Sequence, residues 1–205
     1  MKTNRIFYSA IVLGTGACSL PHTLMAQQQP HIILIVSDQH RGDALNCMGN
    51  PSVITPNLDA LAQDGTLFTN GYSSAPSSTP ARSGLLTGLS PWHHGMLGYG
   101  RVGSQYRYEM PQMLRDLNYF TFGIGKMHWF PQKALHGFHG TLVDESGRVE
   151  TKDFISDYRL WFQMQGSGDL TQTVQVSDGN DHGAAEYKLP EKLHPTAWTE
   201  RWPVK

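Results

Sequence analysis

The segment Ile32-Ile33-Leu34-Ile35-Val36-Ser37-Asp38 contains five consecutive apolar residues and ends at two polar ones. An unbroken apolar run is typical of a strand that is covered on both faces, as in parallel α/β sheets. Polar residues directly after such a strand lie at its carboxyl end, where open α/β sheets bind their ligands. The segment therefore predicts an α/β fold and makes Asp38 a candidate site residue.

Helices alternating with a second strand are predicted after this first strand. Thr55-Pro56 has the composition of a helix start, with Thr as N-cap and Pro in the first turn, and Gly65 ends that helix. Further helices are predicted at about 80–87, 111–117 and 154–164, and a strand at 119–124. The alternation favours the α/β class, but the order of strands in the sheet cannot be obtained from it.

Length and composition fit one globular domain. The chain has 205 residues, 39% apolar and 16% charged, which excludes a disordered, collagen-like or coiled-coil protein. The 16 Lys and Arg nearly balance the 17 Asp and Glu, so the charge gives no reason to expect nucleic acid as a partner. Cys18 and Cys47 are too few for a disulfide framework.

Residues 1–26 are predicted to be a cleaved signal peptide. Lys2 and Arg5 precede the uncharged apolar segment 6–20, and Leu24-Met25-Ala26 ends on a small residue that suits cleavage. A membrane anchor is the less favoured alternative, because about 15 apolar residues fall short of the ~20 that span a bilayer. A lipoprotein site at Cys18 is another. The mature chain is expected in the bacterial periplasm or secreted, with no transmembrane segment.

The most specific segment is Ser78-Thr79-Pro80-Ala81-Arg82-Ser83-Gly84-Leu85-Leu86-Thr87-Gly88. Thr79 and Pro80 are expected to begin a helix whose free N–H groups point back toward Ser78, and a helix N-terminus favours a bound oxyanion. Arg82 lies one helical turn further on and offers a forked donor to anionic oxygen. A hydroxyl nucleophile beside an anion site suits attack on a phosphate or sulfate ester. A Ser/Thr-rich loop capping an ordinary helix is the alternative.

This segment resembles the signature of the type I sulfatases, in which Cys or Ser, any residue, Pro, a small residue and Arg lead toward Leu-Thr-Gly. Four more segments follow in the family's order, at 35–39, 55–59, 125–128 and 194–196. The resemblance covers roughly 32 to 198. It implies the fold of the alkaline phosphatase superfamily, with a mixed, mostly parallel central sheet flanked by helices, and a serine-type bacterial sulfatase.

The resemblance implies a role for each candidate catalytic residue. Ser78 is the residue that a radical-dependent maturase oxidises to formylglycine, and Arg82 steadies the modified side chain. Lys126 binds the substrate and His128 contacts the formylglycine; extended backbone at this spacing would point both side chains to one side. His194 is a candidate general acid for the leaving alkoxide. Without the resemblance, Lys126 and His128 would be interpreted as a basic loop after a strand.

A calcium site is expected at the end of the first strand. Asp38 can reach a cation at the carboxyl edge of the sheet, and Gln39 can supply a neutral oxygen. The resemblance implies Ser78, as formylglycine, as a further ligand. Many family members have two successive Asp residues where this chain has Asp38-Gln39, so the site would be less negative. His93-His94 and Asp181-His182 look metal-like, but we interpret them as structural and loop residues.

The predicted function is hydrolysis of sulfate esters, of glycans or of aryl alcohols, by a formylglycine derived from Ser78 together with Ca²⁺. Residues 27–205 are expected to be an incomplete N-terminal portion of the catalytic domain, because sulfatases of this type are considerably longer. The strand expected to carry a second pair of metal ligands is missing. Two alternatives stay open: a phosphodiesterase or phosphonate monoester hydrolase of the same superfamily, and a truncated, inactive sulfatase-like protein.

Overall fold

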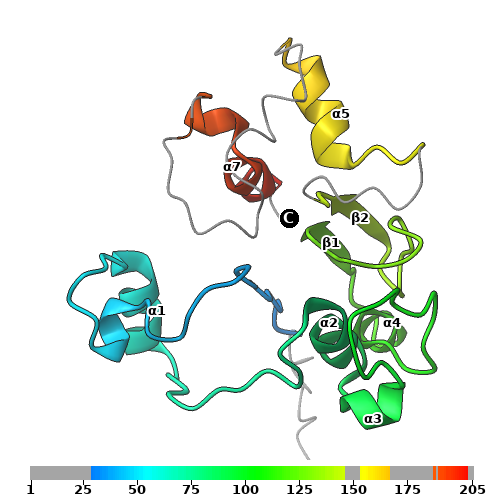
Figure 1. Cartoon of the computed structure of the whole chain (residues 1–205), viewed down its shortest axis with the longest axis horizontal. Coiled ribbons are helices and arrows are strands. Elements are labelled where there is room, and N and C mark those ends of the chain that lie inside the picture. Colours follow the sequence, from blue (N-terminus) through cyan, green and yellow to red (C-terminus); the bar gives the residue numbers. More distant parts are fainter. Residues whose placement is uncertain (1–28, 146–152, 167–186, 188, 203–205) are drawn as a thin grey trace, which may run out of the picture. The chain divides into compact units, whose positions relative to one another are not determined.

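The computed structural model describes residues 29–145, 153–166, 187 and 189–202 (Figure 1). The chain divides into two compact units, Met1–Thr69 and Asn70–Lys205. The predicted signal peptide lies outside the described residues. Among the residues that are described, no helix combines the length and the apolar character needed to cross a membrane.

The first unit contains a short 3-10 helix, η1 (Asn46–Met48), and the helix α1 (Pro56–Asp64). The helix start predicted at Thr55-Pro56 is confirmed. The Thr55 hydroxyl donates to the Asp59 carboxylate at 3.0 Å and accepts from the first amide of η1, also at 3.0 Å. Asp59 accepts in addition from the Cys47 amide at 2.9 Å. Thr55 and Asp59 therefore join η1 to α1.

The strand predicted at residues 32–36 is wrong. These five residues have no regular secondary structure, and their side chains are between 55% and 83% exposed. A strand exists only where neighbouring backbone supplies its hydrogen-bond partners. Within the described part of the chain, the sheet consists of two other strands. The apolar composition indicates a segment suited to burial, but composition does not supply the partner that would bury it.

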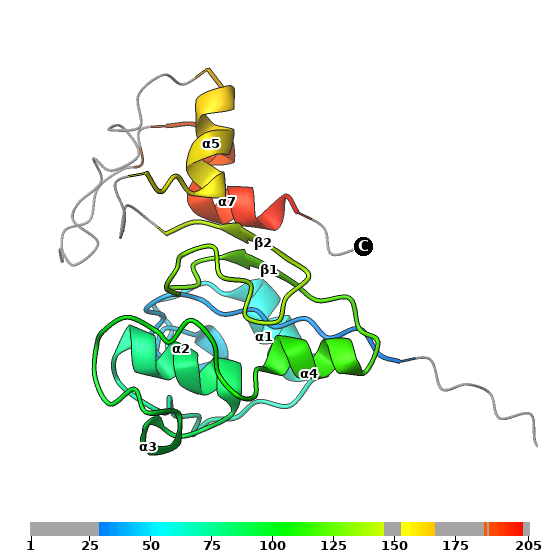
Figure 2. The ribbon, with the colours of Figure 1, turned by 90° about the vertical axis from the view of Figure 1, so that its right-hand side faces the viewer.

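The second unit contains a two-stranded parallel sheet, β1 (Phe122–Gly125) and β2 (Gly140–Val143) (Figure 2). Phe122 is aligned with Gly140, and Gly125 with Val143. The strand predicted at 119–124 is therefore confirmed, although it begins three residues later. A parallel pair with flanking helices agrees with the α/β class. The described residues show only this small part of the larger sheet that the resemblance implies.

Helices lie on both sides of this sheet. Figures 1 and 2 place α5 and α7 on one side of it and α2, α3 and α4 on the other. The predicted helices are confirmed with starts shifted by one to three residues. They are α2 (Ser78–Thr87), α4 (Met110–Asp116) and α5 (Asp157–Met164). The unit also contains α3 (Pro91–His94), the 3-10 helix η2 (Glu191–Leu193) and α7 (Pro195–Glu200), for which no bounds were predicted.

Two buried apolar clusters stabilise the second unit. One joins α5, η2 and α7 to the sheet, and Ile124 of β1 and Leu142 of β2 pack against it; its buried members are Tyr158, Phe162, Leu193 and Trp198. The other lies beneath α2 and contains Leu86, Val102 and Trp129. The first cluster therefore packs against the strands themselves, and the second includes Met127, which follows β1, and Phe138, which precedes β2.

Candidate active site

Ser78 is the first residue of α2, so the helix begins two residues earlier than predicted. The N-cap is Ser77, in extended conformation, and its carbonyl accepts from the Ala81 amide at 3.1 Å. Pro80 fits as the third helical residue because amides of the first turn have no partner within the helix. Ser78 stays partly exposed, whereas Thr79 and Pro80 are buried. The candidate nucleophile thus keeps access to solvent on a rigid support.

Arg82 connects α2 to the segment that follows β1. Its Nη1 donates to the Lys126 carbonyl oxygen at 2.6 Å. Both residues are partly buried, and a hydrogen bond from a charged guanidinium is stronger than one between neutral groups. The structure therefore brings together two predicted site residues that are far apart in the sequence. The contact is made by the Lys126 main chain, which leaves the Lys126 side chain out of this bond.

Residues 126–128 follow β1 without regular secondary structure and form the 126–128 turn, in which the predicted extended geometry is wrong at His128. His128 has a φ of 63°, in the left-handed region that residues other than glycine rarely adopt. The i, i+2 argument, which put the Lys126 and His128 side chains on one side of extended backbone, does not apply to this geometry. The His128 side chain is buried, and its Nε2 lies 3.2 Å from the Tyr99 hydroxyl.

Tyr99 and Gly100 join this turn to the start of α2. The Gly100 amide donates to the Thr79 hydroxyl oxygen at 3.1 Å, one residue after Ser78 in the sequence. Tyr99 is 71% exposed, and its ring meets that of His128 edge to face, with the ring centroids 5.6 Å apart. The sequence analysis missed Tyr99, because an isolated tyrosine in a glycine-rich loop carries no signal of its own.

Glu145 was also missed by the sequence analysis. It lies two residues beyond β2, is 1% exposed, and accepts from the Met127 amide at 3.2 Å and from the His128 amide at 3.0 Å. A buried carboxylate needs such donors to offset the loss of hydration. A usable signal was present, because Asp144-Glu145 follows the short apolar run Leu142-Val143 as Asp38 follows residues 32–36.

His194 is the N-cap of α7. Its Nδ1 accepts from the Thr196 amide at 3.1 Å, and its ring meets that of Tyr187 edge to face at 4.8 Å. In a neutral imidazole, one nitrogen accepts and the other carries the proton. Because Nδ1 is the acceptor, the proton lies on Nε2. The neutral ring can therefore donate a hydrogen bond from Nε2, whereas proton transfer to a leaving group needs the imidazolium form, so the general-acid role stays a prediction.

The predicted calcium ligands are divided between the two units. Asp38 and Gln39 belong to the first unit and are exposed, and Ser78 belongs to the second. Carboxylate, amide and hydroxyl oxygens are the hard donors that Ca²⁺ prefers, so the donor set fits this cation. Among the described residues, no group of three or more His, Cys, Asp or Glu could hold a metal ion. Ligation by these three residues stays a prediction.

His93 and His94, which look metal-like in the sequence, bond to residues that flank their own helix α3. His93 Nδ1 lies 2.7 Å from the Ser90 hydroxyl, and His94 Nδ1 accepts from the Met96 amide at 3.2 Å. These contacts agree with the structural interpretation of His93-His94. The Asp181-His182 pair lies outside the described residues.

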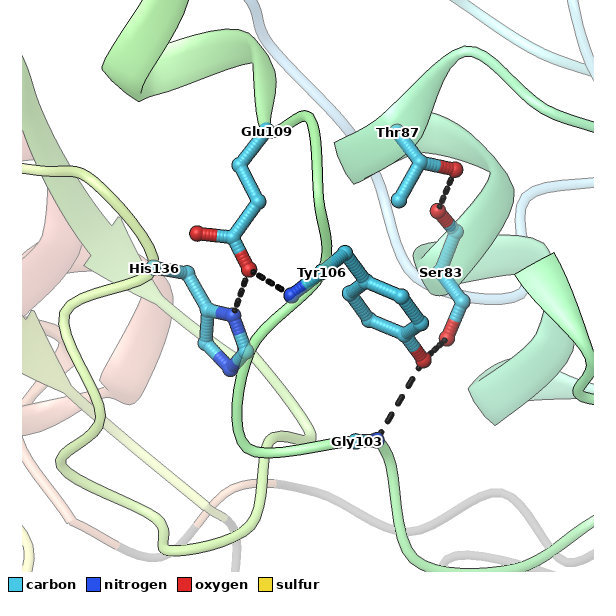
Figure 3. Close-up of polar contacts among 6 residues, drawn as sticks. All are labelled: Ser83, Thr87, Gly103, Tyr106, Glu109 and His136. Carbon is cyan, nitrogen blue, oxygen red and sulfur yellow. Dashed lines mark hydrogen bonds and ion pairs between the residues drawn. The ribbon is translucent and has the colours of Figure 1, made fainter.

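A network of hydrogen bonds joins α2 to the residues that precede α4 (Figure 3). The Ser83 hydroxyl lies 3.0 Å from that of Tyr106, whose amide donates to Glu109 Oε1 at 2.9 Å. The same Glu109 oxygen lies 2.6 Å from His136 Nδ1, and both side chains are buried. The Thr87 hydroxyl also belongs to the network and donates to the Ser83 carbonyl oxygen at 2.7 Å. The helix that carries Ser78 and Arg82 is thereby tied to the start of α4.

A sulfatase family model matches residues 30–164 of this chain, which is more than half of its length. The chain belongs to the sulfatase family. The match includes Asp38, Ser78, Arg82, Lys126 and His128, and it ends before His194. Membership therefore supports the resemblance on which the roles of the first five residues depend, whereas those roles themselves stay predictions.

Several characterised sulfatases are similar to this family member. An arylsulfatase of Clostridium perfringens is 34% identical over 183 residues, 83% of this chain and 38% of that protein. An N-acetylgalactosamine-6-O-sulfatase of Bacteroides thetaiotaomicron is 39% identical over 106 residues, covering 49% of this chain and 21% of that protein. An ulvan-active sulfatase of Formosa agariphila is 40% identical over 134 residues, covering 62% and 26%. The chain thus spans well under half the length of these relatives.

Proposed function

We propose that this sulfatase-family chain carries the nucleophile side of an active site that hydrolyses sulfate esters of sugars or aryl alcohols. The observation that supports this most strongly is the bond from Arg82 to the Lys126 carbonyl, because it joins the helix of Ser78 to the turn of Lys126 and His128. The similar proteins include sulfatases named for aryl, aminosugar and polysaccharide substrates, which supports the substrate class.

The residues of this chain would divide the reaction among them. Ser78, once oxidised to formylglycine and hydrated, attacks sulfur with one hydroxyl of the hydrate as the bond from sulfur to the alcohol oxygen breaks. The remaining hydroxyl then loses its proton and expels sulfate, which regenerates the aldehyde. Arg82 and Lys126 bind the negatively charged sulfate oxygens and stabilise the charge that develops on them. His128 contacts the modified side chain. His194 in its imidazolium form donates its Nε2 proton to the oxygen of the departing alcohol, which leaves as a neutral product while the ring becomes neutral imidazole.

Asp38, Gln39 and the modified Ser78 would hold a calcium ion. When bound, the ion would offset the negative charge of the sulfate group. Gln39 contributes no charge, so the site would attract the cation less strongly than one with two carboxylates at these positions. Weak retention of calcium during dialysis is the consequence we expect.

Export and maturation complete the proposal. Residues 1–26 would direct the chain to the periplasm or the medium of a bacterium, and residues 27–205 would form part of the catalytic domain. A radical-dependent maturase would act on Ser78, since serine rather than cysteine stands at that position. Two of the similar proteins quoted above come from Bacteroides and Clostridium, which agrees with a bacterial setting.

Mass spectrometry of the peptide that contains Ser78 tests the first step. The chain would be produced in cells with and without a serine-type maturase, and loss of two hydrogen atoms at Ser78 is expected only with it. Ser78→Ala is the control that cannot be modified. The modified chain would then be assayed on matched aryl sulfate and aryl phosphate esters. Unmodified Ser78 in the presence of the maturase favours an inactive protein, and faster turnover of the phosphate ester favours a phosphodiesterase.

A further inference from the structure

The turn after β1 lies against the end of β2. The parallel pairing aligns Gly125 with Val143, and the Gly125 carbonyl accepts from the Asp144 amide at 3.1 Å, one residue beyond β2. The hydrogen-bonded pairing therefore continues one residue past β2. As a result, Glu145 reaches the residues that follow β1.

Glu145 holds this turn by its main chain. One carboxylate oxygen accepts from two consecutive amides, Met127 at 3.2 Å and His128 at 3.0 Å, and the side chain is 1% exposed. Hydrogen bonds to an ionised acceptor are stronger than neutral ones, and burial strengthens them further. The left-handed φ of His128 is unfavourable by itself. The two hydrogen bonds from the Met127 and His128 amides to Glu145 offset the cost of this φ and stabilise the conformation of the turn.

The turn that Glu145 holds is in contact with the rest of the candidate site. Its Lys126 carbonyl accepts from Arg82 at 2.6 Å, and its His128 ring contacts the Tyr99 hydroxyl at 3.2 Å. A shift of the turn would therefore displace the main chain that Arg82 contacts and the imidazole at the same time. Glu145 accepts from the main chain of the same turn, so it would act on these contacts through the position of the turn.

We propose that Glu145 is a positioning residue, which fixes the 126–128 turn so that Lys126 can bind a sulfate group and His128 can contact the modified Ser78 side chain. The proposal rests on the function proposed above, because that function assigns sulfate binding to this turn. Glu145 does not need to touch the substrate. It acts on the turn through its hydrogen bonds to the Met127 and His128 amides. A neutral acceptor in its place would form weaker bonds to these amides.

The test compares Glu145→Gln with Asp157→Asn in the full chain. Gln keeps an oxygen acceptor of the same reach and removes the charge. Asp157 is a matched control, because its carboxylate accepts from the Val143 amide of β2 at 2.8 Å and from Lys133 at 2.7 Å, and neither donor belongs to residues 126–128. Backbone amide NMR signals and a titration with inorganic sulfate would be measured on each protein, with circular dichroism as the measure of folding.

In Glu145→Gln, the amide proton signals of Met127 and His128 should move upfield, because their hydrogen bonds to residue 145 weaken. The sulfate Kd should rise about tenfold, as expected when a hydrogen bond to a charged group is weakened. Asp157→Asn should leave the sulfate Kd unchanged. Glu145→Asp, which keeps the charge on a shorter side chain, should fall between wild type and Gln, and it serves as the second variant if Gln unfolds the turn.

Three results would contradict the expectation in different ways. A wild-type sulfate Kd in both Glu145 variants would overturn the positioning role. An equal loss of sulfate affinity in Asp157→Asn would also overturn it, since the loss would then follow from general disorder of β2. Wild-type protein that binds no sulfate would instead overturn the proposed function, and the two failures are therefore distinguishable.

Discussion

Gly137 has a backbone conformation and surroundings that exclude a side chain. Its φ is 83°, and a Cβ at this position would lie 2.5 Å from the Gln112 amide nitrogen and 2.7 Å from the Gln112 Cβ. Gln112 is in α4, so a side chain at 137 would push against the backbone of a helix. The next residue on the N-terminal side is His136, which bonds Glu109 in the network of Figure 3.

We predict that Gly137→Ala lowers the free energy of unfolding by about 2–4 kcal/mol, from the left-handed φ and from overpacking together. Urea unfolding followed by circular dichroism measures this. Gly71→Ala is the control, because a Cβ there meets nothing within 4 Å and the φ is not positive; it should change stability by less than about 0.5 kcal/mol. Equal effects of the two substitutions would show that α4 moves aside freely.

The candidate site could be predicted in part because some of its signals are local. Ser78 and Arg82 lie in one helix, where spacing alone fixes their relation. The partner of Arg82 is the carbonyl of Lys126, which belongs to another segment, so only tertiary structure reveals the bond. Glu145 was missed for the same reason, since its role depends on the pairing of β1 with β2.

At the scale of elements, the Tyr158 side chain joins α5 to η2. Its hydroxyl donates to the Leu193 carbonyl at 2.7 Å, inside the cluster that also contains Trp198. Burial raises the pKa of Tyr158 well above the usual value near 10, and nearby Tyr187 and Asp144 raise this pKa further. The neutral phenol is therefore favoured in the folded protein more than in the unfolded chain.

This shift predicts a loss of stability at alkaline pH. Because the pKa is higher in the folded state, the stabilisation is complete below about pH 10, where the unfolded phenol is also protonated, and it decreases as pH rises above that value. Unfolding free energies measured from pH 8 to pH 11 should show a decrease that is smaller in Tyr158→Phe. At neutral pH the variant should lose about 1 kcal/mol with its hydrogen bond. A decrease of the same size in both proteins would contradict the prediction.

Helices were easier to predict than strands in this chain. Helix starts are marked by local backbone chemistry, here by Thr55-Pro56, by Ser156 and by the prolines near the starts of α2 and α4. The predicted helix bounds therefore differ from those in the structure by only a few residues. A strand depends on a partner that composition does not specify. The strand predicted at 119–124 forms because β2 supplies its partner. Residues 32–36 have the composition of a strand but no paired strand beside them in the described structure.

At the scale of the whole molecule, the near-neutral charge agrees with a site that binds an anion through a few placed residues. Sixteen Lys and Arg against 17 Asp and Glu leave no excess of positive charge to attract sulfate from a distance. Binding would then depend on the short contacts of Arg82 and of the turn that carries Lys126 and His128. An error in the position of that turn would have a correspondingly large effect on affinity.

Exposure of residues 32–36 predicts self-association of these 205 residues. The side chains are apolar and mostly β-branched, and Ile35 is 83% exposed. Such a segment is a template for pairing between chains, and a charge within it opposes that pairing. We therefore expect Ile35→Lys to reduce aggregation on warming several-fold, measured by light scattering, while the free energy of unfolding changes by less than about 0.5 kcal/mol.

Ile124→Lys is the matched substitution at a protected position, because Ile124 lies in β1 and packs against the cluster of Tyr158 and Trp198. Removing this side chain from the packed interior and placing a charge there should lower stability by several kcal/mol and increase aggregation, the opposite of Ile35→Lys. If Ile35→Lys were as destabilising as Ile124→Lys, residues 32–36 would be buried in solution. Residues 32–36 would then form the covered strand that their composition predicts, and this result would contradict the exposure of their side chains in the structure.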